Sequence, residues 1–153
     1  MEKISITLGK LLQLESEING FVNPQTNQTI FIGFRKHKLP LTTKYWLTEL
    51  GDRLIDERKM VDGLRDELIQ KYGEELENGE ISISMFTEKK DEEGTVISRT
   101  INPTYLEFQK EFNELLAQEK ELEYHPLTME DLERAGETTD NYDMLFTLVQ
   151  KPQ

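Results

Sequence analysis

Residues 42–73 read TTKYWLTELGDRLIDERKMVDGLRDELIQKYG and carry the apolar pattern that decides the fold. Apolar residues recur there every seventh position, with two further leucines three residues on, giving Leu47, Leu54, Val61, Leu68, Leu50 and Leu64. This spacing keeps one face of an α-helix apolar over about thirty residues, or roughly 45 Å at 1.5 Å per residue. A domain this small cannot bury such a helix fully, so this apolar stripe of six residues needs a packing partner in this chain or in another chain.

The chain that follows predicts a partner for the stripe. Residues 80–101 form two alternating arms around a charged stretch that ends in Gly94, a pattern typical of a β-hairpin. Asn102 and Pro103 then supply an N-cap and a first helical residue. The apolar face of this return helix consists of Tyr105, Phe108, Phe112 and Leu115. We therefore expect an α+β fold, with a long antiparallel helical pair, a β-hairpin at its tip, and short strands and helices.

Short elements are expected on both sides of this pair. Residues 2–7 alternate as a strand, and residues 8–18 have helical spacing that stops at Asn19-Gly20. Residues 29–34 (TIFIGF) and residues 121–124 also favour strands. At 153 residues the chain predicts one domain over 1–153, with residues 21–38 as an insertion-like strand segment.

The C-terminal tail, residues 128–150, is expected to be helical. Thr128-Met-Glu-Asp131 resembles a capping box and starts a short helix that Gly136 ends. A last amphipathic helix, capped by Thr139 or Asp140, holds Tyr142, Leu145, Phe146 and Val149.

Charge is strongly segregated along the chain, whose net charge is −12. Residues 1–48 carry 6 basic and 3 acidic side chains, and residues 49–153 carry 12 basic and 27 acidic ones. No Asp or Glu occurs from Ile18 to Thr48. One interpretation is that the acidic helices have ordinary solvated faces and that the basic segment is a surface strand with its turn. A second is head-to-tail association of the basic end of one copy with the acidic end of the next. A third is an acidic surface that mimics nucleic acid.

The sequence offers no set of catalytic or metal-binding residues. Its two histidines, His37 and His125, have no partner at helical metal-ligand spacing, and cysteine is absent. The glycines form no phosphate-binding motif, and the stretch 91–94 (DEEG) does not meet the calcium-loop pattern. We expect no enzymatic activity, no metal and no cofactor. No apolar run reaches membrane-spanning length, and the pI of about 4.7 argues against direct nucleic-acid binding.

Three residues of the long helix leave alternatives open. Trp46 either anchors the core against the strand at 29–34 or is an anchor for a partner protein. Gly51 and Gly63 each cost about 1 kcal/mol relative to alanine in a helix. They mark either the close approach of another backbone or points where the helix bends.

Several segments resemble a group of small acidic proteins encoded by tailed bacteriophages and prophages. The resemblance covers residues 8–127 in order, through 8–12 (LGKLL), 39–45 (LPLTTKY), 64–74 (LRDELIQKYGE), the helix 107–116 and the acidic strand 119–127. In that group a leucine-rich segment precedes an L-P-x-x-T/A-x-Y helix start, and the helix ends in K-Y-G. That group has no assigned function, so the resemblance implies a phage origin and transfers no catalytic residues.

Charge segregation and this resemblance together predict a non-enzymatic virion or assembly protein, such as a head–tail connector, ring or tail-associated component. It would be made in the host cytoplasm, join the virion, and bind other phage structural proteins or copies of itself in an oligomer or ring. The alternatives are an acidic anti-defence inhibitor, whose active surface is the region 119–143, and a virion assembly chaperone. The residues expected at the interface are Arg35, Lys36, Lys38, Lys44, Tyr45, Trp46, Leu47, Leu54, Val61 and Leu68.

Overall fold

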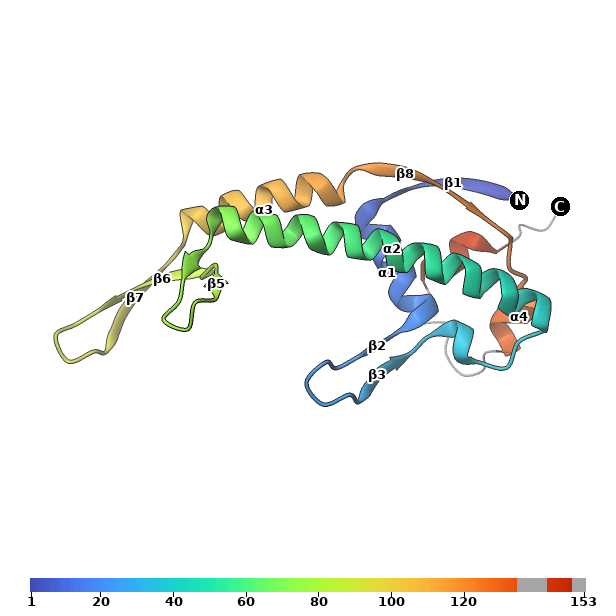
Figure 1. The fold of residues 1–153 in the computed structure, drawn as a ribbon, viewed down its shortest axis with the longest axis horizontal. Coiled ribbons are helices and arrows are strands. Elements are labelled where there is room, and N and C mark those ends of the chain that lie inside the picture. Colours follow the sequence, from blue (N-terminus) through green and yellow to red (C-terminus); the bar gives the residue numbers. More distant parts are fainter. Residues whose placement is uncertain (135–142, 150–153) are drawn as a thin grey trace. The chain divides into compact units, whose positions relative to one another are not determined.

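The computed structural model describes residues 1–134 and 143–149 of the chain. It contains α-helices and antiparallel two-stranded ribbons, which confirms the α+β class (Figure 1). The contacts of the chain divide it into two compact units. Unit 1 is Met1–Lys59 with Gln118–Gln153, and unit 2 is Met60–Ala117. Where the sequence predicts one domain over 1–153, the chain thus groups into two units, and the long helix runs from the first into the second.

Unit 1 begins with a strand that passes directly into a helix, as predicted. Strand β1 (Glu2–Thr7) is followed at once by helix α1 (Leu8–Asn19). The Thr7 hydroxyl caps this helix by accepting a hydrogen bond from the Lys10 N–H at 3.2 Å. Strand β1 pairs antiparallel with β8 (Glu119–Tyr124), which confirms the strand predicted before His125.

The core of unit 1 gathers side chains from both ends of the chain. Helix α1 contributes Leu11, Leu14 and Ile18, and helix α2 (Leu41–Tyr72) contributes the first half of the apolar stripe, Leu47, Leu50 and Leu54. Phe34, strands β1 and β8, and the segment 144–148 complete it. The partner of this half of the stripe is therefore α1, not the return helix that the sequence favours. Both helices have apolar residues at matching intervals, and periodicity does not distinguish between them.

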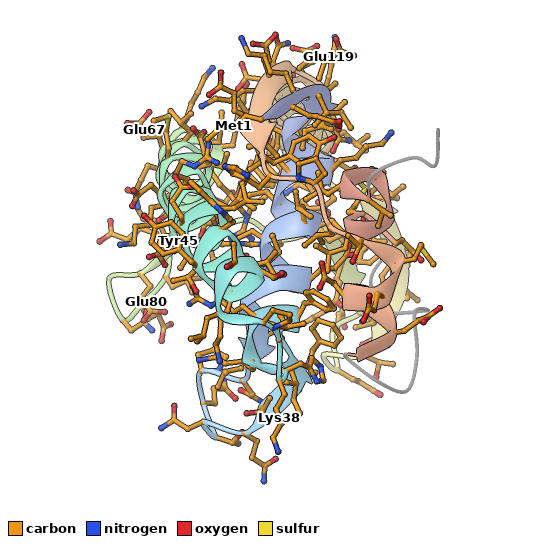
Figure 2. The ribbon with its side chains drawn as sticks, turned by 90° about the vertical axis from the view of Figure 1, so that its right-hand side faces the viewer. Met1, Lys38, Tyr45, Glu67, Glu80 and Glu119 are labelled. Atoms are coloured by element: carbon orange, nitrogen blue, oxygen red, sulfur yellow. The ribbon has the colours of Figure 1, made fainter. Side chains whose placement is uncertain are left out.

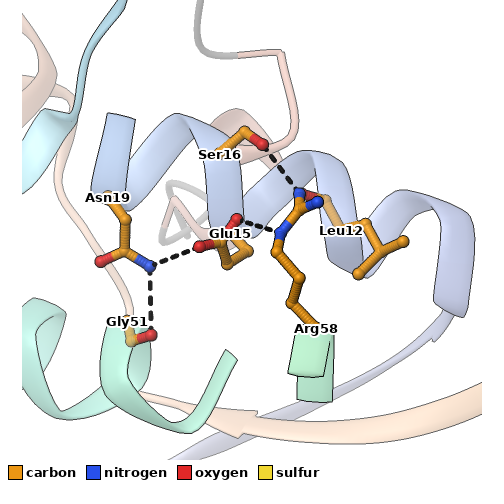
Figure 3. Close-up of polar contacts among 6 residues, drawn as sticks. All are labelled: Leu12, Glu15, Ser16, Asn19, Gly51 and Arg58. Atoms are coloured by element: carbon orange, nitrogen blue, oxygen red, sulfur yellow. Dashed lines mark hydrogen bonds and ion pairs between the residues drawn. The ribbon is translucent and has the colours of Figure 1, made fainter. Parts of the chain in front are cut away.

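A partly buried ion pair joins α1 to α2 inside unit 1 (Figure 3). Arg58 Nε lies 2.6 Å from Glu15 Oε2, and Arg58 Nη2 donates to the Leu12 carbonyl at 2.8 Å and the Ser16 hydroxyl at 2.9 Å. One turn on, Asn19 Nδ2 donates to Glu15 Oε1 at 3.2 Å and to the Gly51 carbonyl at 3.1 Å. The two helices are thus fixed in register by polar contacts beside the core.

The two glycines inside α2 have opposite surroundings. A Cβ at Gly51 would lie 2.7 Å from Asn19 Oδ1 and 3.1 Å from Ile18 Cγ2, whereas a Cβ at Gly63 would meet nothing within 4 Å. Gly51 therefore marks the close approach of α1, which was one of the two interpretations open from the sequence.

We expect the same substitution to have opposite effects at these two positions. Gly63→Ala should raise the free energy of unfolding by about 0.5–1 kcal/mol, because alanine favours the helix and finds open space. Gly51→Ala should lower it by about 1–3 kcal/mol, because the new methyl group displaces the Asn19 amide and its two hydrogen bonds. Urea unfolding of the two variants, followed by circular dichroism, measures both changes. Stabilisation by both substitutions would contradict close packing at Gly51.

The segment between α1 and α2 forms a short ribbon and a single helical turn. Strand β2 (Gly20–Val22) pairs antiparallel with β3 (Thr29–Ile32), and the 3₁₀ turn η1 (Phe34–Lys36) follows. The strand predicted over 29–34 is therefore two residues shorter, because the buried Phe34 begins the 3₁₀ turn.

Unit 2 contains two ribbons where the sequence predicts one hairpin over 80–101. Strand β4 (Glu74–Glu75) pairs with β5 (Ile81–Ser82), and β6 (Phe86–Lys90) pairs with β7 (Val96–Ile101). Two glycines with positive φ, Gly79 at 86° and Gly94 at 84°, make two separate tight turns. The predicted hairpin is confirmed as β6–β7, with its charged turn ending in Gly94, but its first arm is wrong. Gly79 turns the chain back onto β4, so Ile81 belongs to the earlier ribbon.

Helix α3 (Pro103–Leu116) starts as predicted, since the Asn102 side chain accepts a hydrogen bond from the Thr104 N–H at 3.1 Å. Within unit 2 it lies antiparallel to the last turns of α2 (Figure 1). Lys71 Nζ bridges the two helices by contacting Glu111 Oε1 at 3.2 Å. The antiparallel helical pair thus exists over this stretch, and it does not involve the first half of the stripe.

The predicted C-terminal tail is partly described. Thr128 and Asp131 exchange two hydrogen bonds, both 3.1 Å, which confirms the capping box at the start of α4 (Met129–Arg134). The last amphipathic helix corresponds to the 3₁₀ helix η3 (Leu145–Leu148). Its predicted caps, Thr139 and Asp140, and the residues Gly136 and Tyr142 lie outside the described residues.

A buried carboxylate attaches this segment to α1. Glu17 is only 4% exposed, and its Oε1 accepts hydrogen bonds from the backbone N–H groups of Met144 at 2.9 Å and Leu145 at 3.2 Å. Burial raises the pKa of Glu17 above its ordinary value of 4.5, against the opposing effect of these two N–H groups.

This raised pKa predicts a pH dependence of stability. The folded protein holds the Glu17 proton more tightly than the unfolded chain does. The stabilisation linked to this group is therefore complete below pH 4.5 and is lost as the pH rises through the folded pKa. Glu17→Gln should remove this slope, because the amide oxygen still accepts an N–H but does not titrate. Urea unfolding between pH 4 and pH 8, with exposed Glu133→Gln as control, measures it. A pH-independent difference between Glu17→Gln and the wild type would contradict the assignment.

Candidate interface at the start of helix α2

The outer face of α2 carries two large exposed side chains in its first turns. Leu41 is 85% exposed and Tyr45, which is labelled in Figure 2, is 63% exposed. The two residues lie one helical turn apart on the same face. Both line an open groove in unit 1, together with Lys44, Thr48, Glu49 and Asp52. This face combines apolar area with a lysine and two carboxylates, so it suits contact with another macromolecule better than chemistry on a small substrate.

The inner side of the same turns is closed by aromatic packing. The Trp46 ring stacks on the His125 ring with centroids 3.5 Å apart and an interplanar angle of 21°. Tyr45 meets Trp46 edge-on, with centroids 4.9 Å apart. The stack borders a cavity of about 180 Å³ whose wall also includes Thr42, Thr43, Leu47, Leu50, Pro126, Leu127 and Leu148. Trp46 is half-buried and stacks on His125 in the segment after β8, where one interpretation placed it against the strand at 29–34.

The basic residues of the predicted interface differ in their surroundings. Arg35 Nη1 lies 3.1 Å from Asp52 Oδ1, and the Arg35 side chain is only 20% exposed. It therefore fixes the η1 turn against α2. Lys36, Lys38 and Lys44 are exposed, and Lys38 lies on the segment that leads into α2 (Figure 2). These three lysines provide the positive charge at this end of unit 1.

The apolar members of the predicted interface are mostly buried inside the chain. Leu47 and Leu54 belong to the core of unit 1, where they are 2% and 0% exposed. In unit 2, Val61 is 3% exposed and Leu68 is half-buried. Leu47, Leu54 and Val61 therefore do not lie on an exposed surface, because the chain itself covers this part of the stripe.

The structure adds two residues that sequence reasoning missed. Leu41 is one of them, and it is spaced i, i+4 from Tyr45 on a face away from the stripe. That spacing was the available indication of an exposed apolar pair. His125 is the other, and its stacking on Trp46 joins residues 79 positions apart, for which the sequence has no local indication.

Residues 1–134 and 143–149 contain no group of three or more His, Asp or Glu side chains that could hold a metal ion. Within the same ranges no helix is long and apolar enough to cross a bilayer. No family model matches the chain, and neither a curated protein nor a solved structure gives a significant match.

Proposed function

We propose that this chain is a non-enzymatic structural or assembly protein of a tailed bacteriophage, of the head–tail connector, ring or tail-associated kind. It acts by binding other phage proteins or further copies of itself. The observation that carries this proposal is the pair of exposed side chains, Leu41 and Tyr45, with Lys44 beside them on the outer face of α2. Aromatic residues on such a face are frequent anchors of protein–protein contacts.

The charge of the neighbouring segment supports a partner with an acidic surface. Exposed Lys36, Lys38 and Lys44 lie in a stretch, Ile18 to Thr48, that contains no Asp or Glu. Complementary charge increases the rate of encounter and fixes the orientation of a complex. The phage resemblance of residues 8–127 supplies the class of partner. On this proposal the protein is made in the host cytoplasm and becomes part of the virion.

Mass spectrometry of purified phage particles tests the proposal. We expect the wild-type protein in the particles at a fixed ratio to the major structural proteins. Tyr45→Glu should reduce its amount at least tenfold, because it places a carboxylate at the centre of the apolar face. Met60→Glu, at a residue that is also 63% exposed, should leave the amount unchanged. Particles without the wild-type protein would contradict a virion role.

A second candidate is an assembly chaperone, which is present late in infection and absent from finished particles.

A third candidate is the acidic inhibitor of nucleic-acid-binding proteins, with its active surface over 119–143. Exposed Glu119, Glu121 and Glu123 favour it, since they alternate along strand β8. Lys3 lies 3.4 Å from Glu121 and 3.5 Å from Glu123, however, and this pairing weakens their resemblance to a row of phosphates. Residues 135–142 of that surface lie outside the described residues.

A further inference from the structure

Two of the ribbons, one in each unit, expose apolar side chains. In unit 1 the β2–β3 ribbon exposes Phe21, Val22, Ile30 and Ile32, each by about half or more. In unit 2 the β6–β7 ribbon exposes Phe86, Val96, Ile97 and Ile101, each by 42% or more. An isolated two-stranded ribbon is marginally stable in water, and exposed apolar strands tend to associate. Both ribbons are therefore expected to be covered when the protein works.

The two ribbons carry different charge. Residues 20–32 contain no charged side chain, and exposed Lys36 and Lys38 follow closely. The β6–β7 turn instead carries Asp91, Glu92 and Glu93, within a unit of 6 basic and 14 acidic residues over 60–117. A basic border on one ribbon and an acidic turn on the other are complementary.

The acidic turn is held in a defined shape. Asp91 Oδ1 accepts hydrogen bonds from the N–H groups of Glu93 at 3.0 Å and Thr95 at 2.9 Å. Gly94 has a φ of 84° and donates its N–H to the Asp91 carbonyl at 3.1 Å. The side chains of Glu92 and Glu93 therefore project from a fixed turn. Along the ribbon, Arg99 pairs with Glu88 at 2.8 Å and lies over the Phe86 ring.

We propose that the β2–β3 ribbon of one copy binds the β6–β7 ribbon of a second copy, with Glu92 and Glu93 beside Lys36 and Lys38. This inference rests on the proposed function in so far as both require a protein that acts by association. A second copy is the occupant because each chain carries both complementary surfaces. Contact between two β2–β3 ribbons is disfavoured, because it brings two basic borders together.

The proposed contact joins unlike surfaces, so it is heterologous. After one contact has formed, the pair of copies still has one free ribbon of each kind, one on each copy. Such contacts repeat and give a ring when the rotation closes or a filament when it does not. A ring is the arrangement expected of a connector component.

Mixing two variants tests this arrangement directly. Ile30→Asp disables the β2–β3 surface and Ile97→Asp disables the β6–β7 surface; these residues are 62% and 61% exposed, so neither substitution reaches the core. Sedimentation velocity should show oligomers for the wild type and for the control Met60→Asp. Each ribbon variant alone should dissociate at concentrations at least tenfold higher than the wild type does. An equimolar mixture should form a dimer of one copy of each, because one intact pair of surfaces remains.

Each other outcome overturns the inference. A dimer formed by one ribbon variant alone would show contact between like ribbons. A mixture that stays monomeric would show that the two ribbons do not bind each other, even if one variant had lost its local ribbon structure. A monomeric wild type would also overturn self-association. The proposed function would still stand in each of these cases if the wild type copurified with particles, so the two failures are distinguishable.

Discussion

Replacing Arg58 with leucine is expected to lower the free energy of unfolding by about 3 kcal/mol. The guanidinium of Arg58 contacts the Glu15 carboxylate at 2.6 Å and also donates to Leu12 and Ser16 on the same helix (Figure 3). The whole Glu15 residue is only 7% exposed. Leucine would leave this carboxylate buried without its cation, and the unpaired charge costs more than the pair contributes. Urea unfolding followed by circular dichroism measures the loss.

Two further variants separate the effect of the ion pair from the effect of replacing any arginine of this helix. Glu15→Leu with Arg58→Leu removes both charges, and it should be more stable than Arg58→Leu alone, since no unpaired charge remains. Arg65→Leu changes an exposed arginine of the same helix and should alter stability by less than about 0.5 kcal/mol. An Arg58→Leu protein as stable as Arg65→Leu would show that the pair does not hold α1 against α2.

Gly33→Ala is expected to cost about 3 kcal/mol or more, because the substituted side chain would overlap backbone atoms. A Cβ at this position would lie 2.3 Å from the Asn19 carbonyl carbon, 2.4 Å from the Ile18 oxygen and 2.5 Å from the Gly20 nitrogen. Gly33 itself has a φ of −66°, which alanine adopts without strain. The expected loss therefore reports the close approach of the two chain segments at the base of the β2–β3 ribbon and not the backbone conformation.

Urea unfolding of Gly33→Ala, followed by circular dichroism, measures the loss of stability. Gly63→Ala is the matched control, since that position has open space. The loss in Gly33→Ala should also appear as changed amide shifts in α1 and β2, on either side of the contact. A Gly33→Ala protein with wild-type stability would show that the base of the β2–β3 ribbon is more loosely packed than these distances indicate.

Local elements were predictable where the sequence contains specific helix or turn chemistry. Asn102-Pro103 marks the start of α3, and the Thr128–Asp131 capping box marks the start of α4. In both cases the side chain satisfies backbone groups within three residues, so the sequence itself holds the whole interaction. The strand β1 and the helix α1 follow from their periodicities for the same reason.

The pairing of elements was harder to predict. Both α1 and α3 offer an apolar face to the stripe of α2, and only the structure shows that Leu47, Leu50 and Leu54 pack in the core with α1. The split of residues 74–101 into two ribbons depends on the positive φ of Gly79. Such a conformation is permitted by glycine but not required by it.

The residues that the sequence places at an interface differ in their exposure. Lys44 and Tyr45 are exposed as expected, but Arg35 pairs with Asp52, and Leu47 and Leu54 are covered by the chain itself. Leu41 shows the opposite case, since an apolar residue is exposed off the main stripe. A periodic pattern identifies which residues share a face, whereas their exposure depends on what packs against that face.

The central claim is that copies of this protein associate with one another through charged and apolar surfaces, and the molar mass in solution tests this claim most directly. Light scattering over a concentration series, at low and at high salt, is the measurement. If copies associate, the measured mass should rise above the 17.9 kDa of one chain as the concentration increases. The rise should be smaller at high salt, because screening weakens the contact between lysines and carboxylates. A mass that stays at that of one chain under every condition would contradict self-association.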